Sequence, residues 1–88
     1  WPATYVPSLV DEYEQVSDAE AFAMTRRVVR EEGLLVGVSC GMALVGAVRV
    51  AERRPDDLVV TILPDSGRNY LSKAFDDGWM REHGFEVD

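Results

Sequence analysis

The stretch that most constrains this chain is GLLVGVSCGMAL, residues 33–44. Its apolar residues at 34–36 predict a short buried strand, and glycines at 37 and 41 frame a tight turn. Residues 41–53 read as a helix whose first ten residues are apolar nearly all round, so it must be covered on several sides. This order indicates an α/β fold and places Ser39 at the corner between strand and helix.

A second apolar run, LVVTIL at residues 58–63, is rich in β-branched residues and is stopped by Pro64. Such a run is typical of a central strand in a parallel sheet. With the helix between them, the two strands predict a right-handed strand–helix–strand crossover. Ligands of these folds bind where strands end and helices begin, and Ser39 and Asp65 hold those positions.

The flanking segments predict three further helices. Residues 1–16 carry two prolines and scattered aromatics and fit an extended connection. Ser17 and Glu20 have capping-box spacing, so a helix should begin there and end at Gly33. Its buried face should hold Ala21, Phe22, Thr25, Val28 and Val29. Residues 68–75 and 77–82 predict two short helices that carry Tyr70, Phe75 and Trp79, with Phe85 beyond them, for packing.

Composition excludes several classes of protein. The 88 residues make at most one domain, and 16 acidic against nine basic residues give a net charge of −7, which disfavours nucleic acid and anionic membranes. The single cysteine, Cys40, excludes an internal disulfide and a multi-cysteine metal site and suits the cytoplasm.

The longest apolar run, residues 34–48, is too short and too glycine-rich for a membrane span, and no secretory signal is visible. The arginines at 26, 27, 30, 49, 53 and 54 are expected to offset helix dipoles.

Two hypotheses that place a catalytic nucleophile in this turn remain open at this point. GVSCG fits the G-x-S-x-G elbow of serine hydrolases, and Ser39, Asp65 and His83 follow in the order of a triad. Against it, nothing before residue 33 offers the second oxyanion-hole amide, and His83 resembles an exposed helix end. Cys40 with His83 as its base is the thiol variant. A lone cysteine in an apolar helix start is more commonly a small buried hydrophobe.

Three ordered segments carry a family resemblance: EEGLLVGVSCG (31–41), ILPDSGRNYLSK (62–73) and DGWM (77–80). Together they resemble the C-terminal part of the catalytic domain of the cystathionine β-synthase family. This family belongs to the fold-type II pyridoxal phosphate enzymes, which implies a fragment of a three-layer parallel-sheet domain. The likeness runs from about residue 5 to residue 85. PDSGRNY followed by WM favours this family over the similar O-acetylserine sulfhydrylases, which look more like PSSGERY.

The resemblance implies a role for Ser39, because the matching serine of the family hydrogen-bonds the pyridine nitrogen of pyridoxal 5'-phosphate. A neutral hydroxyl donates to that nitrogen without supplying the charge that would keep it protonated, which suits β-elimination and β-replacement. Gly37 and Gly41 would let backbone approach the flat ring, or serve the turn alone. Asp65 and Ser66 would lie near the ring edge, although a turn-forming role is the simpler interpretation.

The resemblance also implies what the chain lacks. Family members hold the cofactor as a Schiff base on a lysine, and bind its phosphate in a loop, in an N-terminal half that has no match in this sequence. Lys73 matches a C-terminal motif and is read as a surface or structural residue. We therefore expect residues 1–88 to be the C-terminal portion of a catalytic domain, inactive alone, with the remainder of that domain as partner.

The complete enzyme is expected to be a homodimeric lyase of transsulfuration and cysteine biosynthesis. It would condense L-serine with L-homocysteine to L-cystathionine. A sulfhydrylase (cysteine synthase), the serine hydrolase above and a ligand-free interaction module are the alternatives.

Overall fold

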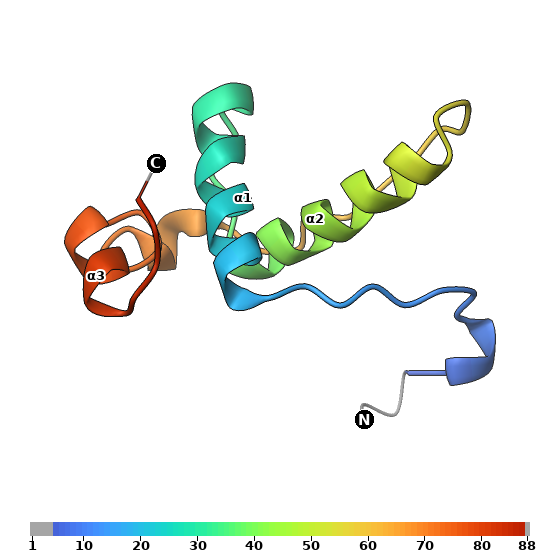
Figure 1. Cartoon of the computed structure of the whole chain (residues 1–88), viewed down its shortest axis with the longest axis horizontal. Coiled ribbons are helices and arrows are strands. Elements are labelled where there is room, and N and C mark those ends of the chain that lie inside the picture. Colours follow the sequence, from blue (N-terminus) through green and yellow to red (C-terminus); the bar gives the residue numbers. More distant parts are fainter. Residues whose placement is uncertain (1–4, 88) are drawn as a thin grey trace.

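The computed structural model describes residues 5–87 and is shown in Figure 1. Along the chain come the 3-10 turn η1 (Pro7–Leu9), helix α1 (Asp18–Glu32), helix α2 (Val38–Arg53), the 3-10 turn η2 (Gly67–Tyr70) and helix α3 (Asp77–Glu82). Helices α1 and α2 meet near their N-terminal ends and diverge from there, while η2 and α3 form a smaller lobe beside α1. No helix among these residues is long and apolar enough to cross a membrane.

Helix α1 begins and ends as the sequence predicts. The Ser17 hydroxyl accepts a hydrogen bond from the Glu20 N–H at 3.2 Å, and the Glu20 carboxylate accepts one from the Ser17 N–H at 3.2 Å, which completes the capping box. At the other end Gly33 adopts a left-handed conformation with φ of 68°, where glycine avoids the steric cost of a side chain. The predicted inner face is largely confirmed, because Ala21, Thr25 and Val28 are buried.

Small residues bring α1 and α2 close together. A Cβ atom added to Gly41 would lie 2.0 Å from the Thr25 hydroxyl oxygen and 2.4 Å from the Ala21 carbonyl oxygen. The helices therefore touch backbone to backbone at this point. Below the contact lies a small core of Val28, Val36 and Cys40, against which Met24, Leu44 and Leu63 pack.

Helix α2 differs from its prediction in two respects. It begins at Val38, three residues earlier than expected, because Gly37 acts as the N-cap and Ser39 already lies inside the first turn. It is also covered less completely than its apolar sequence requires, since Met42 and Val48 remain 44% and 41% exposed. An apolar helix with open faces indicates that further protein packs on it.

The predicted parallel strands do not form among the described residues. Residues 34–36 and 58–63 are extended but contain no strand, and a single antiparallel bridge joins Val36 to Ser66. The bridge consists of hydrogen bonds from the Gly37 N–H to the Asp65 carbonyl and from the Gly67 N–H to the Leu35 carbonyl, both 3.1 Å. The expected parallel crossover was therefore not found. A strand needs hydrogen bonds to a neighbour along its length, and residues 58–63 have none within the described range.

The C-terminal lobe packs on α1 through aromatic rings. Helix α3 confirms the predicted helix at 77–82, whereas the expected helix at 68–75 is only η2 followed by a turn. Phe22 of α1 contacts Trp79, at 5.5 Å between ring centroids, and Phe85, at 4.5 Å, and the latter two rings lie 6.3 Å apart. Arg26 adds a 3.0 Å hydrogen bond to the Ala74 carbonyl and an ion pair with Asp77.

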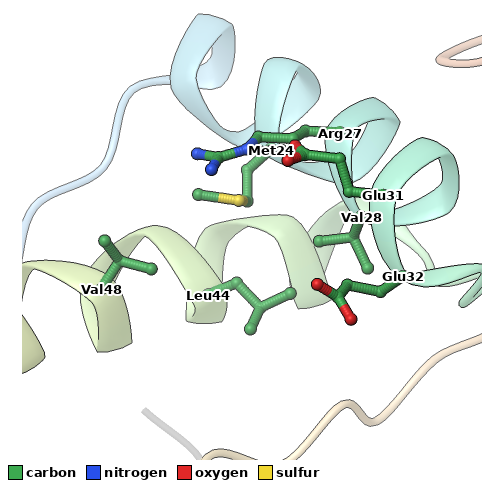
Figure 2. Close-up of a pocket in the computed structure, with 7 residues that line it drawn as sticks. All are labelled: Met24, Arg27, Val28, Glu31, Glu32, Leu44 and Val48. Carbon is green, nitrogen blue, oxygen red and sulfur yellow. Dashed lines mark hydrogen bonds and ion pairs between the residues drawn. The ribbon is translucent and has the colours of Figure 1, made fainter.

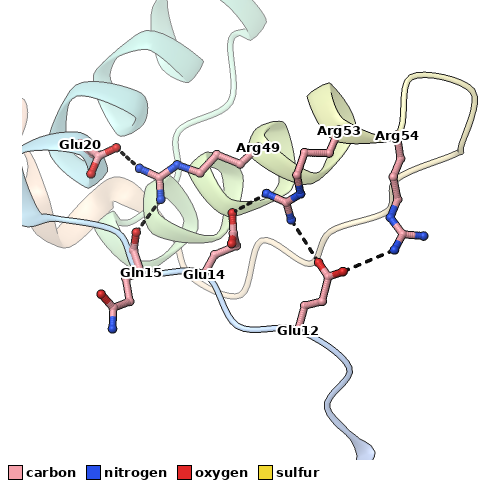
Figure 3. A network of polar contacts seen from close by, with 7 residues as sticks. All are labelled: Glu12, Glu14, Gln15, Glu20, Arg49, Arg53 and Arg54. Carbon is pink, nitrogen blue, oxygen red and sulfur yellow. Dashed lines mark hydrogen bonds and ion pairs between the residues drawn. The ribbon is translucent and has the colours of Figure 1, made fainter.

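Residues 10–16 form an extended strap along α2, in agreement with the predicted connection; the rest of that segment contains η1, and residues 1–4 lie outside the described range. Arginines from α2 and its C-terminal end hold the strap (Figure 3). The contacts join Arg49 to Glu20 and the Gln15 carbonyl, Arg53 to Glu14 (3.0 Å) and Glu12 (3.1 Å), and Arg54 to Glu12 (3.4 Å). These arginines therefore bind specific carboxylates and a carbonyl, which the sequence interpretation as dipole partners did not foresee.

Candidate functional site

Ser39 is the second residue of α2 and faces outward from its first turn. The turn is closed by hydrogen bonds to the Gly37 carbonyl, from the Cys40 N–H at 3.0 Å and the Gly41 N–H at 3.3 Å. Within residues 5–87 the exposed Ser39 hydroxyl has no hydrogen-bond partner. It is therefore free to donate to an acceptor on another molecule or another part of the protein.

The loop at Asp65 lies directly against this turn. The Cys40 sulfur is 3.3 Å from both the Asp65 nitrogen and the Asp65 carbonyl oxygen, and the Gly37 N–H bonds the same carbonyl at 3.1 Å. The structure thus brings together the two chain positions that the sequence singled out. It does so through the backbone of Asp65.

The side chains of Asp65 and Ser66 shape their own loop. The Asp65 carboxylate accepts a hydrogen bond from the Ser66 N–H at 2.8 Å, and the Ser66 hydroxyl accepts one from the Arg68 N–H at 3.2 Å. The second bond caps η2. The turn-forming interpretation of both residues is confirmed.

The two turn glycines are required by the protein's own packing. A Cβ atom on Gly37 would lie 2.6 Å from the Asp65 carboxylate. A Cβ atom on Gly41 would likewise collide with Thr25 and Ala21 of α1. Their absence of side chains is explained without a bound ring, so of the two interpretations offered for them the structural one has direct support.

The structure does not assemble the hydrolase triad. His83 follows α3, its Nδ1 lies 2.9 Å from the Trp79 carbonyl oxygen, and its ring stacks on Trp79 with centroids 4.1 Å apart. Among the described residues no hydrogen bond joins His83 to Asp65 or to Ser39. A general base needs hydrogen-bond reach to its nucleophile, so Ser39 is not activated in this arrangement.

Cys40 and Lys73 lie where their simpler interpretations place them. Cys40 is fully buried in the core and its sulfur is occupied by the Asp65 backbone. This is the small buried hydrophobe that the sequence suggested. Lys73 is exposed in the turn after η2 and bonds only through its backbone: its N–H donates to the Tyr70 carbonyl at 3.0 Å, and its carbonyl accepts from the Asp76 N–H at 2.9 Å. In the described part of the chain no cluster of His, Cys, Asp or Glu could hold a metal ion.

A shallow hollow of about 240 Å³ opens elsewhere, between the diverging parts of α1 and α2 (Figure 2). Its floor is apolar, and acidic and basic side chains of α1 stand around it. The lining residues are Met24, Arg27, Val28, Glu31, Glu32, Leu44 and Val48. Ser39 does not line it, so the hollow is separate from the candidate site.

Sequence reasoning missed the clamp between Cys40 and Asp65 that fixes this site. The signal available was weak: Cys40 lies three residues after Gly37, hence one helical turn further on the same side. Nothing in the sequence showed that residue 65 would be its partner. The clamp matters because it holds the first turn of α2, and with it Ser39, against the loop after residue 63.

The family model described as pyridoxal-phosphate dependent enzyme matches residues 1–65. The chain therefore belongs to the pyridoxal phosphate-dependent enzyme family. Among curated relatives it is similar to the cystathionine beta-synthases of Dictyostelium discoideum, at 44% identity over 78 residues, and Oryctolagus cuniculus, at 44% over 85 residues. These matches cover 88% and 96% of this chain but 16% and 15% of the relatives, so the chain spans a small part of their length. The resemblance found in the sequence is confirmed.

The candidate site fits a contact to pyridoxal phosphate. The ring nitrogen of pyridoxal phosphate is a hydrogen-bond acceptor. Ser39 offers a neutral hydroxyl that is exposed and has no hydrogen-bond partner among the described residues. The Asp65 carboxylate accepts a hydrogen bond from its own loop, and His83 lies against Trp79.

Proposed function

We propose that this chain is the C-terminal portion of the catalytic domain of an enzyme that condenses L-serine with L-homocysteine to give L-cystathionine. Membership of the pyridoxal phosphate family and the names of the relatives support this substrate class. The observation that carries the role of this segment is the free Ser39 hydroxyl on the first turn of α2, uncommitted within residues 5–87. In this proposal Ser39 donates its hydrogen bond to the ring nitrogen of the cofactor.

The cofactor supplies, when bound, an electron sink for breaking bonds at the α and β carbons of an amino acid. Ser39 contributes a donor of fixed position and no charge. An aspartate there would hold a proton on the ring nitrogen and deepen the sink, whereas a neutral alcohol leaves the nitrogen unprotonated. A moderate sink favours loss of the β-substituent over other fates of the amino acid.

The surrounding residues act by positioning Ser39. Backbone hydrogen bonds and the Cys40 sulfur tie the first turn of α2 to the Asp65 loop, and Gly41 lets the same turn rest on α1. A donor held on a rigid helix end from two sides keeps its direction, which is what preorganised hydrogen bonding requires.

The remaining machinery belongs to other parts of the protein in this proposal. Lys73, which is the chain's single lysine, is exposed in a turn and bonds only through its backbone, so we assign the cofactor lysine and the phosphate loop to the rest of the catalytic domain. The 88-residue chain alone is then inactive. We further propose that the complete enzyme is a cytoplasmic homodimer that binds neither nucleic acid nor membranes. The net charge of −7 on this chain supports the last part, because it disfavours contact with nucleic acid and anionic membranes.

A graft tests the proposed function. The 85-residue matching stretch of the Oryctolagus cuniculus relative is replaced by that of this chain, which is 44% identical to it. The graft should bind pyridoxal phosphate, seen by its visible absorbance, and form cystathionine. Ser39→Ala should slow cystathionine formation about tenfold, the loss of one hydrogen bond of ~1.4 kcal/mol.

Ser8→Ala, at an exposed serine in η1, is the matched control and should leave the rate unchanged. A folded graft that binds the cofactor and yet forms no cystathionine would overturn the proposed substrates. Equal rates for the Ser39→Ala graft and its parent would overturn the role of Ser39.

A further inference from the structure

The strap, residues 10–16, runs antiparallel to α2 and is joined to it by charged groups. Its polar contacts follow one another back along the helix toward the start of α1 (Figure 3). In chain order, Glu12 bonds Arg53 and Arg54, Glu14 bonds Arg53, and the Gln15 carbonyl accepts from Arg49. Each of these contacts ends on a guanidinium group of α2 or of the residue that caps its C-terminus. The strap can therefore detach stepwise, beginning at Glu12.

The strap rests on α2 at a position without a side chain. A Cβ atom on Gly46 would lie 3.6 Å from the Glu14 Cβ, which is ordinary van der Waals contact. Gly46, Arg49 and Arg53 are separated by three and four residues, so they share one face of the helix. This face gives the strap a flat seat on the helix backbone with two cations beside it.

The two arginines of this face are held differently. Arg49 also forms an ion pair with Glu20, which belongs to α1 and its capping box, so it keeps a partner when the strap leaves. Arg53 pairs only with strap carboxylates among the described residues, through Nη1 with Glu14 and through Nη2 with Glu12. One guanidinium therefore holds the outer part of the strap.

The ion pairs of Arg53 are open to solvent. Its side chain is 47% exposed, and those of Glu12 and Glu14 are 48% and 27% exposed. Salt screens such pairs, because the Debye length falls from about 10 Å at 0.1 M to about 3 Å at 1 M. Each exposed pair changes an equilibrium by at most about fivefold. The helices α1 and α2 are instead joined by a buried apolar core, which charge screening does not weaken.

We propose that the strap is an ion-pair latch, which closes on α2 at low ionic strength and opens at high ionic strength while the two long helices stay packed. Arg53 is the residue that holds the latch closed. The cap at Ser17, where α1 begins, is its fixed end. The inference goes beyond the proposed function, because the latch lies at the opposite end of α2 from Ser39 and needs no cofactor.

Disulfide trapping in the 88-residue chain measures how far the latch is closed. Glu14→Cys together with Gly46→Cys places two Cβ atoms 3.6 Å apart in the closed strap, within disulfide range. Glu12 still pairs with Arg53 in this double variant. In a glutathione buffer the ratio of disulfide to dithiol should fall roughly two- to fivefold between about 0.05 M and about 1 M NaCl. Cys40 is fully buried and gives no background.

Arg53→Gln in the same double variant should lower the ratio by a similar factor at low salt and remove most of its salt dependence. This separates the latch from effects of salt on thiol chemistry. Arg68→Gln is the matched control, at an exposed arginine of η2 whose side chain has no polar partner among the described residues. It should behave like the double variant itself. Circular dichroism follows the helices throughout.

A ratio that neither salt nor Arg53→Gln changes overturns the proposal. An equal loss in Arg68→Gln does so too, because net charge rather than the latch would then control the strap. Loss of the helical signal together with the disulfide at high salt also overturns it, since the strap would not move separately. None of these outcomes changes the proposed role of Ser39, which is tested on the graft.

Discussion

Gly41 and Gly46 lie on the same helix, but only Gly41 has no room for a side chain. Alanine at Gly41 would drive its Cβ into the Thr25 hydroxyl and the Ala21 carbonyl, whereas a Cβ on Gly46 meets Glu14 at an ordinary 3.6 Å. The Ala21 carbonyl belongs to the backbone of α1, which cannot move without separating α1 from α2.

We therefore expect Gly41→Ala to lower the free energy of unfolding by about 1–3 kcal/mol, as overpacking does. Gly46→Ala is the matched control and should raise it by up to about 1 kcal/mol, because alanine is the better helix former. Urea titration followed by circular dichroism measures both. Equal effects of the two substitutions would show that the close approach of the helices is wrong.

At the scale of an element, the capping box makes α1 sensitive to acid. Hydrogen bonds from the Ser17 backbone N–H and hydroxyl, followed by the ion pair with Arg49, lower the pKa of Glu20 below its ordinary value. A carboxyl whose pKa is lowered by folding stabilises the fold above its unfolded pKa of about 4.3. That contribution is lost as the pH falls through the lowered pKa.

Glu20→Gln removes this titration. The wild type should have the higher urea midpoint at pH 7, and its advantage should shrink as the pH falls through the lowered pKa of Glu20. Glu52→Gln, at an exposed carboxylate without an ion pair among the described residues, should change the midpoint little at neutral or acid pH. A difference between wild type and Glu20→Gln that stays constant from neutral to acid pH would contradict the capping box.

The helices could be predicted from the sequence because their signals are local. The Ser17 cap, the Gly33 end and the apolar spacing between them are all contained in α1. The strands could not, because residues 34–36 and 58–63 need neighbours to become a sheet, and apolar composition does not supply them. The side chains of residues 58–63 alternate between half-buried and exposed, so this segment keeps a strand-like form without a neighbouring strand.

The candidate site was predictable in part for the same reason. The glycine-framed turn located Ser39, and the strand end located Asp65, each from its immediate surroundings. The clamp through Cys40 and the binding of Arg49 and Arg53 to the strap depend on residues at least 25 positions away. Sequence spacing cannot rank such distant partners against a local role such as a helix dipole.

At the scale of the whole molecule, the chain is open. Its diverging helices, its exposed strand-like segment and its extent of 41 × 34 × 22 Å leave apolar faces uncovered. Such faces are usual where a larger protein or a second copy completes the core. The proposed catalytic domain accounts for that openness, and it leaves the first turn of α2 as the part that meets the cofactor.

The proposed role of Ser39 as a neutral donor to the cofactor's ring nitrogen can be measured by ¹⁵N NMR of ring-labelled pyridoxal phosphate bound to the Oryctolagus cuniculus graft. We expect an unprotonated ring nitrogen with Ser39 and a protonated one in Ser39→Asp, while Ser8→Asp leaves the spectrum of the parent graft unchanged. Identical ring-nitrogen shifts for Ser39 and Ser39→Asp, with the cofactor bound in both, would refute that role.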